Sequence, residues 1–86
     1  MEQTEKDVKT IIIKVSKLPG SAEGLEDGTT LGELNYNDPM CRSLESKLNQ
    51  YVKEQGADER IDDGDLDPDK TAGEVVEIVE DKLQVP

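Results

Sequence analysis

The feature that most constrains the fold of this chain is a run of β-branched residues at positions 10–18, Thr-Ile-Ile-Ile-Lys-Val-Ser-Lys-Leu. In an extended strand, Ile11, Ile13 and Val15 project from one side and the other side is mostly polar, which is typical of a half-buried strand. A Pro-Gly dipeptide directly after the run indicates a turn. We therefore predict a first β-strand over residues 8–18, against which the core is built.

The clearest predicted helix covers residues 38–55. Asp38 suits the N-cap, Pro39 suits the first helical position and Gly56 suits the position just past the end. Apolar residues recur every three or four positions, which gives one apolar stripe able to lie on a sheet. The stripe consists of Met40, Leu44, Leu48, Tyr51 and Val52. Cys41 flanks the stripe and is expected to be a small buried residue, because the chain has no histidine to activate its thiol.

The segments before and after this helix give weaker signals. A Thr-x-x-Glu spacing at residues 30–33 predicts one helical turn, and an Asp-Gly dipeptide before it predicts a tight turn. Residues 71–83 fit two patterns. Four of the five residues at 75–79 are β-branched, which favours a strand, whereas a capping-box spacing from Thr71 and an apolar stripe favour a helix. We take the strand as the main interpretation and the helix as the alternative.

Residues 21–30 have few apolar side chains and are expected to form at most a weak return strand at a sheet edge. The predicted order of first strand, weak strand, helix, acidic turn region and last strand resembles the ubiquitin-like β-grasp fold. Within that fold it is similar to the bacterial sulfur carriers of the ThiS/MoaD type. The resemblance is carried by Leu-Pro-Gly at 18–20, by Leu-Glu-Asp-Gly-Thr-Thr-Leu at 25–31, and by residues 67–79, which end Gly-Glu-Val-Val-Glu-Ile-Val. It implies an α+β protein in which a small mixed sheet packs on one main helix.

The resemblance also implies a domain organisation. We expect one β-grasp-like domain over residues 8–83, with a flexible tail at 1–7 and a short tail at 84–86. Sulfur carriers and modifiers of this family act through a C-terminal Gly-Gly, whereas this sequence ends Leu-Gln-Val-Pro. Carrier chemistry is therefore expected to be absent. A modifier or adaptor whose tail matures differently stands as the alternative function.

Composition narrows the range of partners. Ten basic residues against 21 acidic residues leave a net charge of −11, which repels nucleic acid and anionic membranes and attracts basic proteins. The single cysteine fits a reducing compartment, and no run approaches the ~20 apolar residues of a membrane span. We expect a soluble, cytoplasmic protein. The chain has no Phe and no Trp, so the core is predicted to be aliphatic and thin, and homodimerisation would stabilise it.

No motif indicates an enzyme, a cofactor or a metal site. Nothing in the acidic stretch predicts the burial that catalytic carboxyl pairs need, and a nucleophile with an activating base is absent from the sequence. With one cysteine and no histidine, soft zinc ligands are too few. The acids at positions 63, 65, 67 and 74 follow the spacing of an EF-hand loop, but Pro68 stands where that loop needs glycine.

The acidic segment at residues 57–69 is the candidate binding surface. If it were extended, alternate carboxylates would lie about 6.6 Å apart, matching every second phosphate of a DNA strand at ~3.4 Å spacing. We therefore predict a non-catalytic protein that binds a basic surface of a protein partner. The predicted binding residues are Asp58, Glu59, Asp62, Asp63, Asp65, Asp67, Asp69, Glu74, Glu77 and Glu80.

This prediction has a more specific form and two alternatives. Phage-encoded DNA mimics are similar in size and acidity, so the specific form is inhibition of a host nucleic-acid-binding protein. The charge could instead serve solubility alone, by keeping chains apart. The protein could also be a structural subunit of a phage or bacterial assembly.

Overall fold

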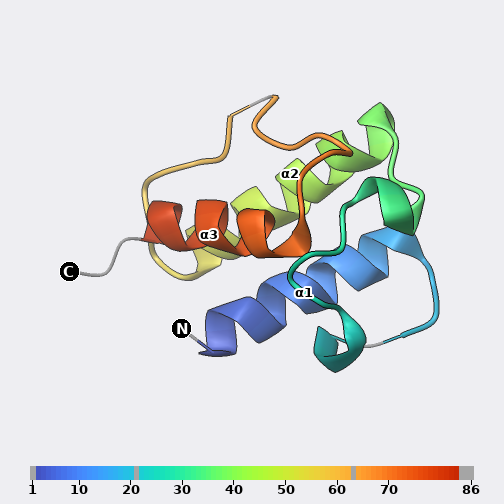
Figure 1. The fold of residues 1–86 in the computed structure, drawn as a ribbon. Coiled ribbons are helices and arrows are strands. Elements are labelled where there is room, and N and C mark those ends of the chain that lie inside the picture. Colours follow the sequence, from blue (N-terminus) through green and yellow to red (C-terminus); the bar gives the residue numbers. More distant parts are fainter. Residues whose placement is uncertain (1, 21, 63, 84–86) are drawn as a thin grey trace.

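The computed structural model describes residues 2–20, 22–62 and 64–83, and these are mainly helical (Figure 1). The elements are α1 (Glu2–Ser16), the 3₁₀ turns η1 (Ala22–Gly24) and η2 (Gly32–Leu34), α2 (Asp38–Glu54) and α3 (Ala72–Leu83). The described ranges contain no sheet, and their one β-type pairing is an isolated antiparallel bridge between Thr30 and Thr71. The predicted α+β class, and with it the ubiquitin-like β-grasp fold and the likeness to sulfur carriers, is therefore wrong.

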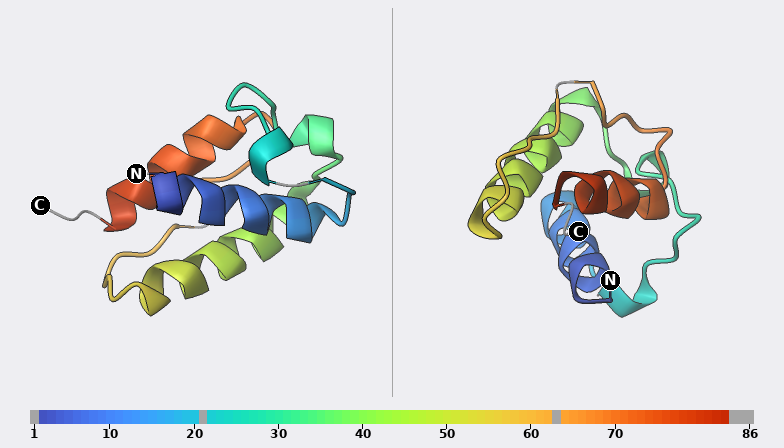
Figure 2. Two further views of the ribbon diagram at one scale, coloured as in Figure 1. Left: turned by 90° about the horizontal axis from the view of Figure 1, so that it is seen from below. Right: turned by 90° about the vertical axis from the view of Figure 1, so that its left-hand side faces the viewer.

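Three helices form the body of the molecule. α1 packs against both α2 and α3, and α2 and α3 also touch each other. Figures 1 and 2 show that α2 and α3 both run broadly opposite to the direction of α1. Two long connections, from α1 to α2 and from α2 to α3, meet near the start of α3. There Leu31 donates its N–H to the carbonyl of Lys70 at 2.9 Å.

The β-branched run forms a helix because one face of that helix is buried. Thr4, Val8 and Ile12 follow one another at intervals of four residues, and all three are buried. A β-branched residue costs at most about 0.7 kcal/mol in a helix, whereas full burial of a Val or Ile side chain contributes about 1.5–3 kcal/mol. The predicted strand over 8–18 is therefore wrong. Residues 2–7, for which the sequence predicts a flexible tail, form the first turns of α1.

The helix predicted at 38–55 is confirmed as α2. It begins at Asp38, but the predicted N-cap is wrong by one residue. The N-cap is Asn37, whose side chain accepts a hydrogen bond of 3.0 Å from the N–H of Met40. The predicted end is also right. Gly56 has a φ of +87°, in the left-handed region that favours glycine. Its N–H donates to the carbonyl of Lys53 at 2.9 Å, which closes the last turn.

Residues 71–83 follow the helical alternative, so the strand predicted there is wrong. Thr71 and Glu74 form a reciprocal capping box at the start of α3. The Glu74 N–H donates to the Thr71 hydroxyl at 3.1 Å, and the Thr71 N–H donates to the Glu74 carboxylate at 2.9 Å. The hydrogen bond from the Thr71 N–H is the main reason that the pKa of Glu74 lies below its usual value. Val75, Val76 and Val79 are buried on the inner face of the helix.

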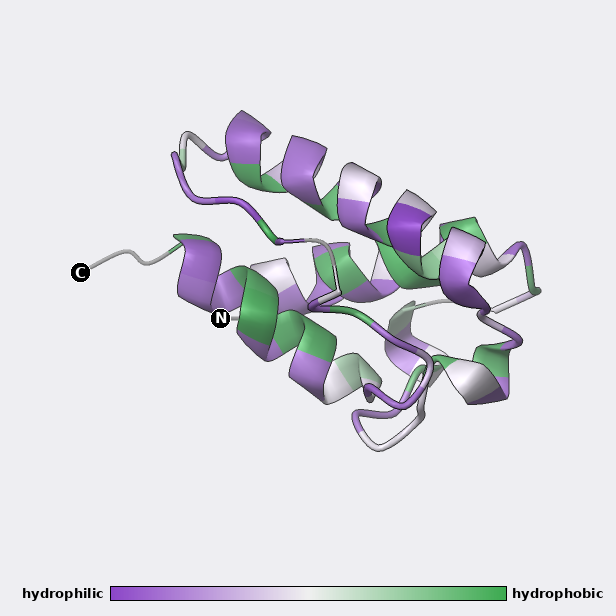
Figure 3. Ribbon diagram, turned by 90° about the horizontal axis from the view of Figure 1, so that it is seen from above, coloured by the Kyte–Doolittle hydropathy of each residue, from purple (hydrophilic) through white to green (hydrophobic). Residues whose placement is uncertain are grey.

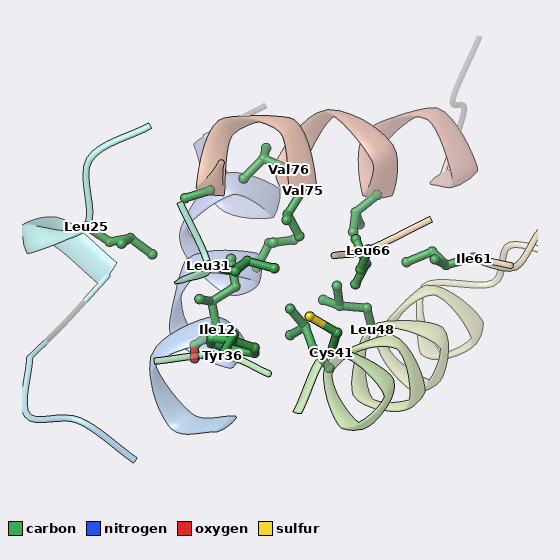
Figure 4. Close-up of a cluster of buried hydrophobic side chains, with 14 of the residues drawn as sticks. Ile12, Leu25, Leu31, Tyr36, Cys41, Leu48, Ile61, Leu66, Val75 and Val76 are labelled. Carbon is green, nitrogen blue, oxygen red and sulfur yellow. Dashed lines mark hydrogen bonds between the residues drawn. The ribbon is translucent and has the colours of Figure 1, made fainter. Parts of the chain in front are cut away.

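The core draws side chains from all three helices and from the two long connections (Figure 4). Its fully buried members include Ile12, Leu31, Leu44, Leu48, Ile61, Val75 and Val79. Figure 3 shows hydrophobic residues on the inner sides of the helices and hydrophilic residues on their outer sides. The predicted aliphatic core is confirmed, with Tyr36 as its buried aromatic residue. Cys41 is buried as expected. Within the part of the chain that the structure describes, no helix has the length and apolar character needed to cross a membrane.

Candidate functional site

The acidic connection between α2 and α3 is held against α2 by two polar side chains. The Asn49 amide accepts from the Ile61 N–H at 2.6 Å and donates to the Ile61 carbonyl at 3.1 Å. The Glu45 side chain is buried, and one of its oxygens accepts from the N–H groups of Gly64 and Leu66 at 3.3 and 3.4 Å. Ile61 and Leu66 are themselves buried. The segment is therefore anchored at two points along α2.

The described part of the anchored segment contains turns or bends at residues 64–65 and 68–69, so its aspartates do not form one extended row. The Asp62 N–H donates to the Asp65 carboxylate at 3.2 Å, and the Asp69 N–H donates to the Asp67 carboxylate at 2.8 Å. Two of the predicted carboxylates thus stabilise local turns instead of lining an edge. Asp63 lies outside the described residues. Among the residues described, no three acidic or cysteine side chains lie close enough together to hold a metal ion.

A different set of carboxylates surrounds a hollow of about 620 Å³ between α1, the turn at residues 27–28 and α3. The acids lining this hollow, here called the acidic groove, are Glu5, Asp27, Glu74, Glu77 and Glu80. The structure therefore brings together three of the predicted binding residues. The predicted residues of the 57–69 segment that the structure describes do not line this hollow. We define the groove by these five carboxylates.

Two residues of the acidic groove were missed by the sequence analysis. Glu5 was assigned to a flexible tail and Asp27 to a turn, and nothing in the sequence brings these two positions near α3. The helical alternative for residues 71–83 does predict part of the acidic groove. It places Glu74 and Glu77 three positions apart, on one face of a helix.

Lys9 fixes the position of the turn that borders the acidic groove. Its ammonium lies 2.7 Å from the Asp27 carboxylate and 3.5 Å from that of Glu5, with a side chain that is only 11% exposed. The hydrogen bond to Asp27 is the main reason that the pKa of Lys9 is raised. The carbonyl of Asp27 accepts from the Gly73 N–H at 2.9 Å. A Cβ at residue 73 would lie 3.1 Å from the Cβ of Asp27, so glycine allows this close approach.

A second hollow, of about 580 Å³, has the opposite charge. It lies between the second half of α1 and the first half of α2, and we call it the basic groove. Its lining residues are Ile11, Lys14, Val15, Lys17, Met40, Ser43 and Lys47, with no carboxylate among them. The strand predicted over residues 8–18 does not indicate this groove, because a strand places Lys14 on the opposite side from Ile11 and Val15. In the helix, Ile11, Lys14 and Val15 share one face.

The thiol of Cys41 is not set up as a nucleophile. Burial is the main reason that its pKa is raised, and the nearby carboxylates of Asp38, Asp67 and Glu45 raise it further. A raised pKa keeps the thiol protonated, whereas reactive cysteines have lowered pKa values. Cys41 is therefore not a candidate catalytic residue, and the acidic and basic grooves are the candidate binding sites considered below.

Comparison of this chain with protein-family models, curated proteins and solved structures finds no match. Function is therefore inferred from the charges and hollows of the described residues.

Proposed function

We propose that this protein is a non-catalytic binding protein whose acidic groove docks on a basic surface of a protein partner. The observation that carries this proposal is the convergence of five carboxylates from three separate elements on one hollow. Lys9 pairs with two of them, Asp27 and Glu5, so the glutamates of α3 are the main attraction for a basic partner. A hollow lined by charges of one sign concentrates the electrostatic field and attracts oppositely charged groups more strongly than a flat surface does. Lysine and arginine side chains of a partner fit such a groove.

The rest of the negative charge supports the same proposal. Residues 57–83 contain eleven acidic and three basic residues, so this part of the chain carries most of the net charge of −11. Asp58, Glu59, Asp62 and Asp69 are exposed on the connection between α2 and α3. Exposed charges of this kind increase the rate at which a basic partner is encountered. In this proposal the predicted residues form two groups. The glutamates of α3 line the groove and contact the partner, and the exposed acids of the 57–69 segment attract it from a distance.

The proposal is broader than DNA mimicry. The turns at Asp65 and Asp67 remove the regular phosphate-like spacing on which the mimicry hypothesis depended. Nucleic-acid-binding proteins remain among the candidate partners, because their basic surfaces suit an acidic groove. A cytoplasmic location also remains part of this proposal, based on the single free cysteine.

The proposal is tested by affinity capture from a nuclease-treated bacterial lysate with two matched variants. Glu74→Gln with Glu77→Gln removes two charges from the groove, and glutamine at position 74 keeps the capping box. Glu33→Gln with Glu54→Gln removes two exposed charges outside both the groove and the 57–69 segment. We expect proteins retained by the unmodified chain to be lost with the groove variant and kept with the control. Equal retention by both variants would contradict the proposal.

A further inference from the structure

The basic groove has an apolar floor that the fold leaves partly uncovered. Ile11 and Val15 lie one helical turn apart on α1, and Met40 comes from the first turn of α2. All three pack against the core but are only partly buried. A concave apolar surface between two helices is the kind of site that accepts side chains spaced along one face of a partner helix.

The rim of the same groove carries positive charge without internal compensation. Lys14 and Lys17 lie on the α1 side and Lys47 lies on the α2 side, and all three are exposed. Within residues 2–20, 22–62 and 64–83, none of these three ammonium groups forms an ion pair. Residues 10–22, which include Lys14 and Lys17, contain no acidic residue in a chain whose net charge is −11. An occupant of this groove gains most if it places carboxylates on both sides of an apolar stripe.

We infer that the basic groove binds an acidic amphipathic helix of a partner protein. The partner's apolar stripe lies on Ile11, Val15 and Met40, and its flanking carboxylates pair with the lysines. A second copy of this chain is a poorer occupant because the three described helices bury most of their apolar residues in their own core. A lipid tail is also a poorer occupant, because the partly exposed floor residues make the hollow too shallow to enclose it. The site is independent of the acidic groove, which lies at the other end of α1.

The test uses a display library of helical peptides of about 16 residues with a fixed apolar stripe. Positions beside the stripe are randomised among glutamate, lysine and glutamine, and the library is selected on the intact protein. We expect a glutamate-rich class whose binding perturbs amide NMR signals of residues 11–17 and 40–47. Lysine-rich peptides that perturb Glu74 and Glu77 would report on the acidic groove instead, so the two proposals are separately tested.

A charge-matched pair of variants completes the test. Lys14→Glu with Lys47→Glu should weaken the glutamate-rich peptides about tenfold or more. Lys53→Glu with Arg60→Glu changes the net charge equally at exposed positions outside the groove and should change affinity less than about twofold. If charge reversal unfolds the protein, Lys14→Gln with Lys47→Gln replaces it, and an intermediate loss is expected.

Three outcomes would overturn the inference. One is a library that yields no glutamate-rich binders, and another is an equal loss of affinity in the two charge-matched variants. The third is displacement of the selected peptides by phosphatidylglycerol vesicles that perturb the same amide signals, because the occupant would then be a lipid surface.

Discussion

The phenolic hydroxyl of Tyr36 donates a hydrogen bond of 2.7 Å to the backbone carbonyl of Ile12. Both residues are buried, and 24 positions separate them in the sequence. Figure 4 shows the two side chains next to each other in the core. This contact fastens the long connection between α1 and α2 onto the second half of α1. It thereby fixes the position at which α2 begins.

Replacement of Tyr36 with Phe should lower the free energy of unfolding by about 1 kcal/mol, because the ring remains packed while its hydrogen bond is lost. Tyr36→Ala also removes the buried ring and should cost about 3–5 kcal/mol. Urea denaturation followed by circular dichroism measures both changes. A Phe variant as unstable as the Ala variant would show that the hydroxyl, and not the ring, dominates.

The same hydroxyl predicts a loss of stability at alkaline pH. Burial raises the pKa of Tyr36 well above its ordinary value, and burial also raises the pKa of Tyr51 and Cys41. The unfolded chain loses these protons first, so the stabilisation is complete below the unfolded pKa values and declines as the pH rises above them. Thermal melts between about pH 8 and pH 11 should show a falling melting temperature. The decline should be smaller in Tyr36→Phe, and equal slopes would contradict this assignment.

Residues that begin or end a helix could be predicted correctly from the sequence. The runs of β-branched residues could not, because they predict strands where the structure has helices. The left-handed glycine at position 56 and the capping box at Thr71 and Glu74 depend on contacts within a few residues, so the sequence determines them. The preference of isoleucine and valine for strands is small, and burial against other helices outweighs it. The helical spacing of Val8 and Ile12 was present in the sequence. The residues before Val8 are polar, so the apolar stripe is too short to predict a helix from the sequence.

The net charge could be predicted from the sequence, but its distribution could not. The acidic groove combines Glu5, Asp27 and the glutamates of α3, which are far apart in the chain and meet only because the helices pack as they do. The regular spacing predicted for the aspartates does not occur, for a different reason. Asp65 and Asp67 accept hydrogen bonds from neighbouring N–H groups, which is a common use of aspartate in turns.

Asn49→Ala should release the acidic segment from α2. The amide makes two hydrogen bonds to the backbone of Ile61, and their loss should lower the free energy of unfolding by about 1–3 kcal/mol. Limited proteolysis should then cleave the segment at residues 57–66 faster than in the unmodified chain. Gln50→Ala is the matched control, because Gln50 is exposed on the same helix. Cleavage at the same rate in both variants would show that Asn49 does not hold the segment.

We propose that the exposed carboxylates of the 57–69 segment attract a basic partner and that the acidic groove contacts it. The two groups of residues should therefore affect different rate constants for binding of a basic ligand. An arginine-alanine peptide serves as the probe, and surface plasmon resonance measures its association and dissociation. The variant Asp58→Asn with Asp62→Asn should slow association about two- to fivefold and leave dissociation nearly unchanged, because these exposed carboxylates attract without contact. Glu74→Gln with Glu77→Gln should speed dissociation instead. Raising the salt from about 50 to about 500 mM should remove the difference in association rate, because salt screens long-range attraction between exposed charges. If both variants change only the association rate, the acidic groove attracts the ligand without contacting it, and the groove is not the docking site.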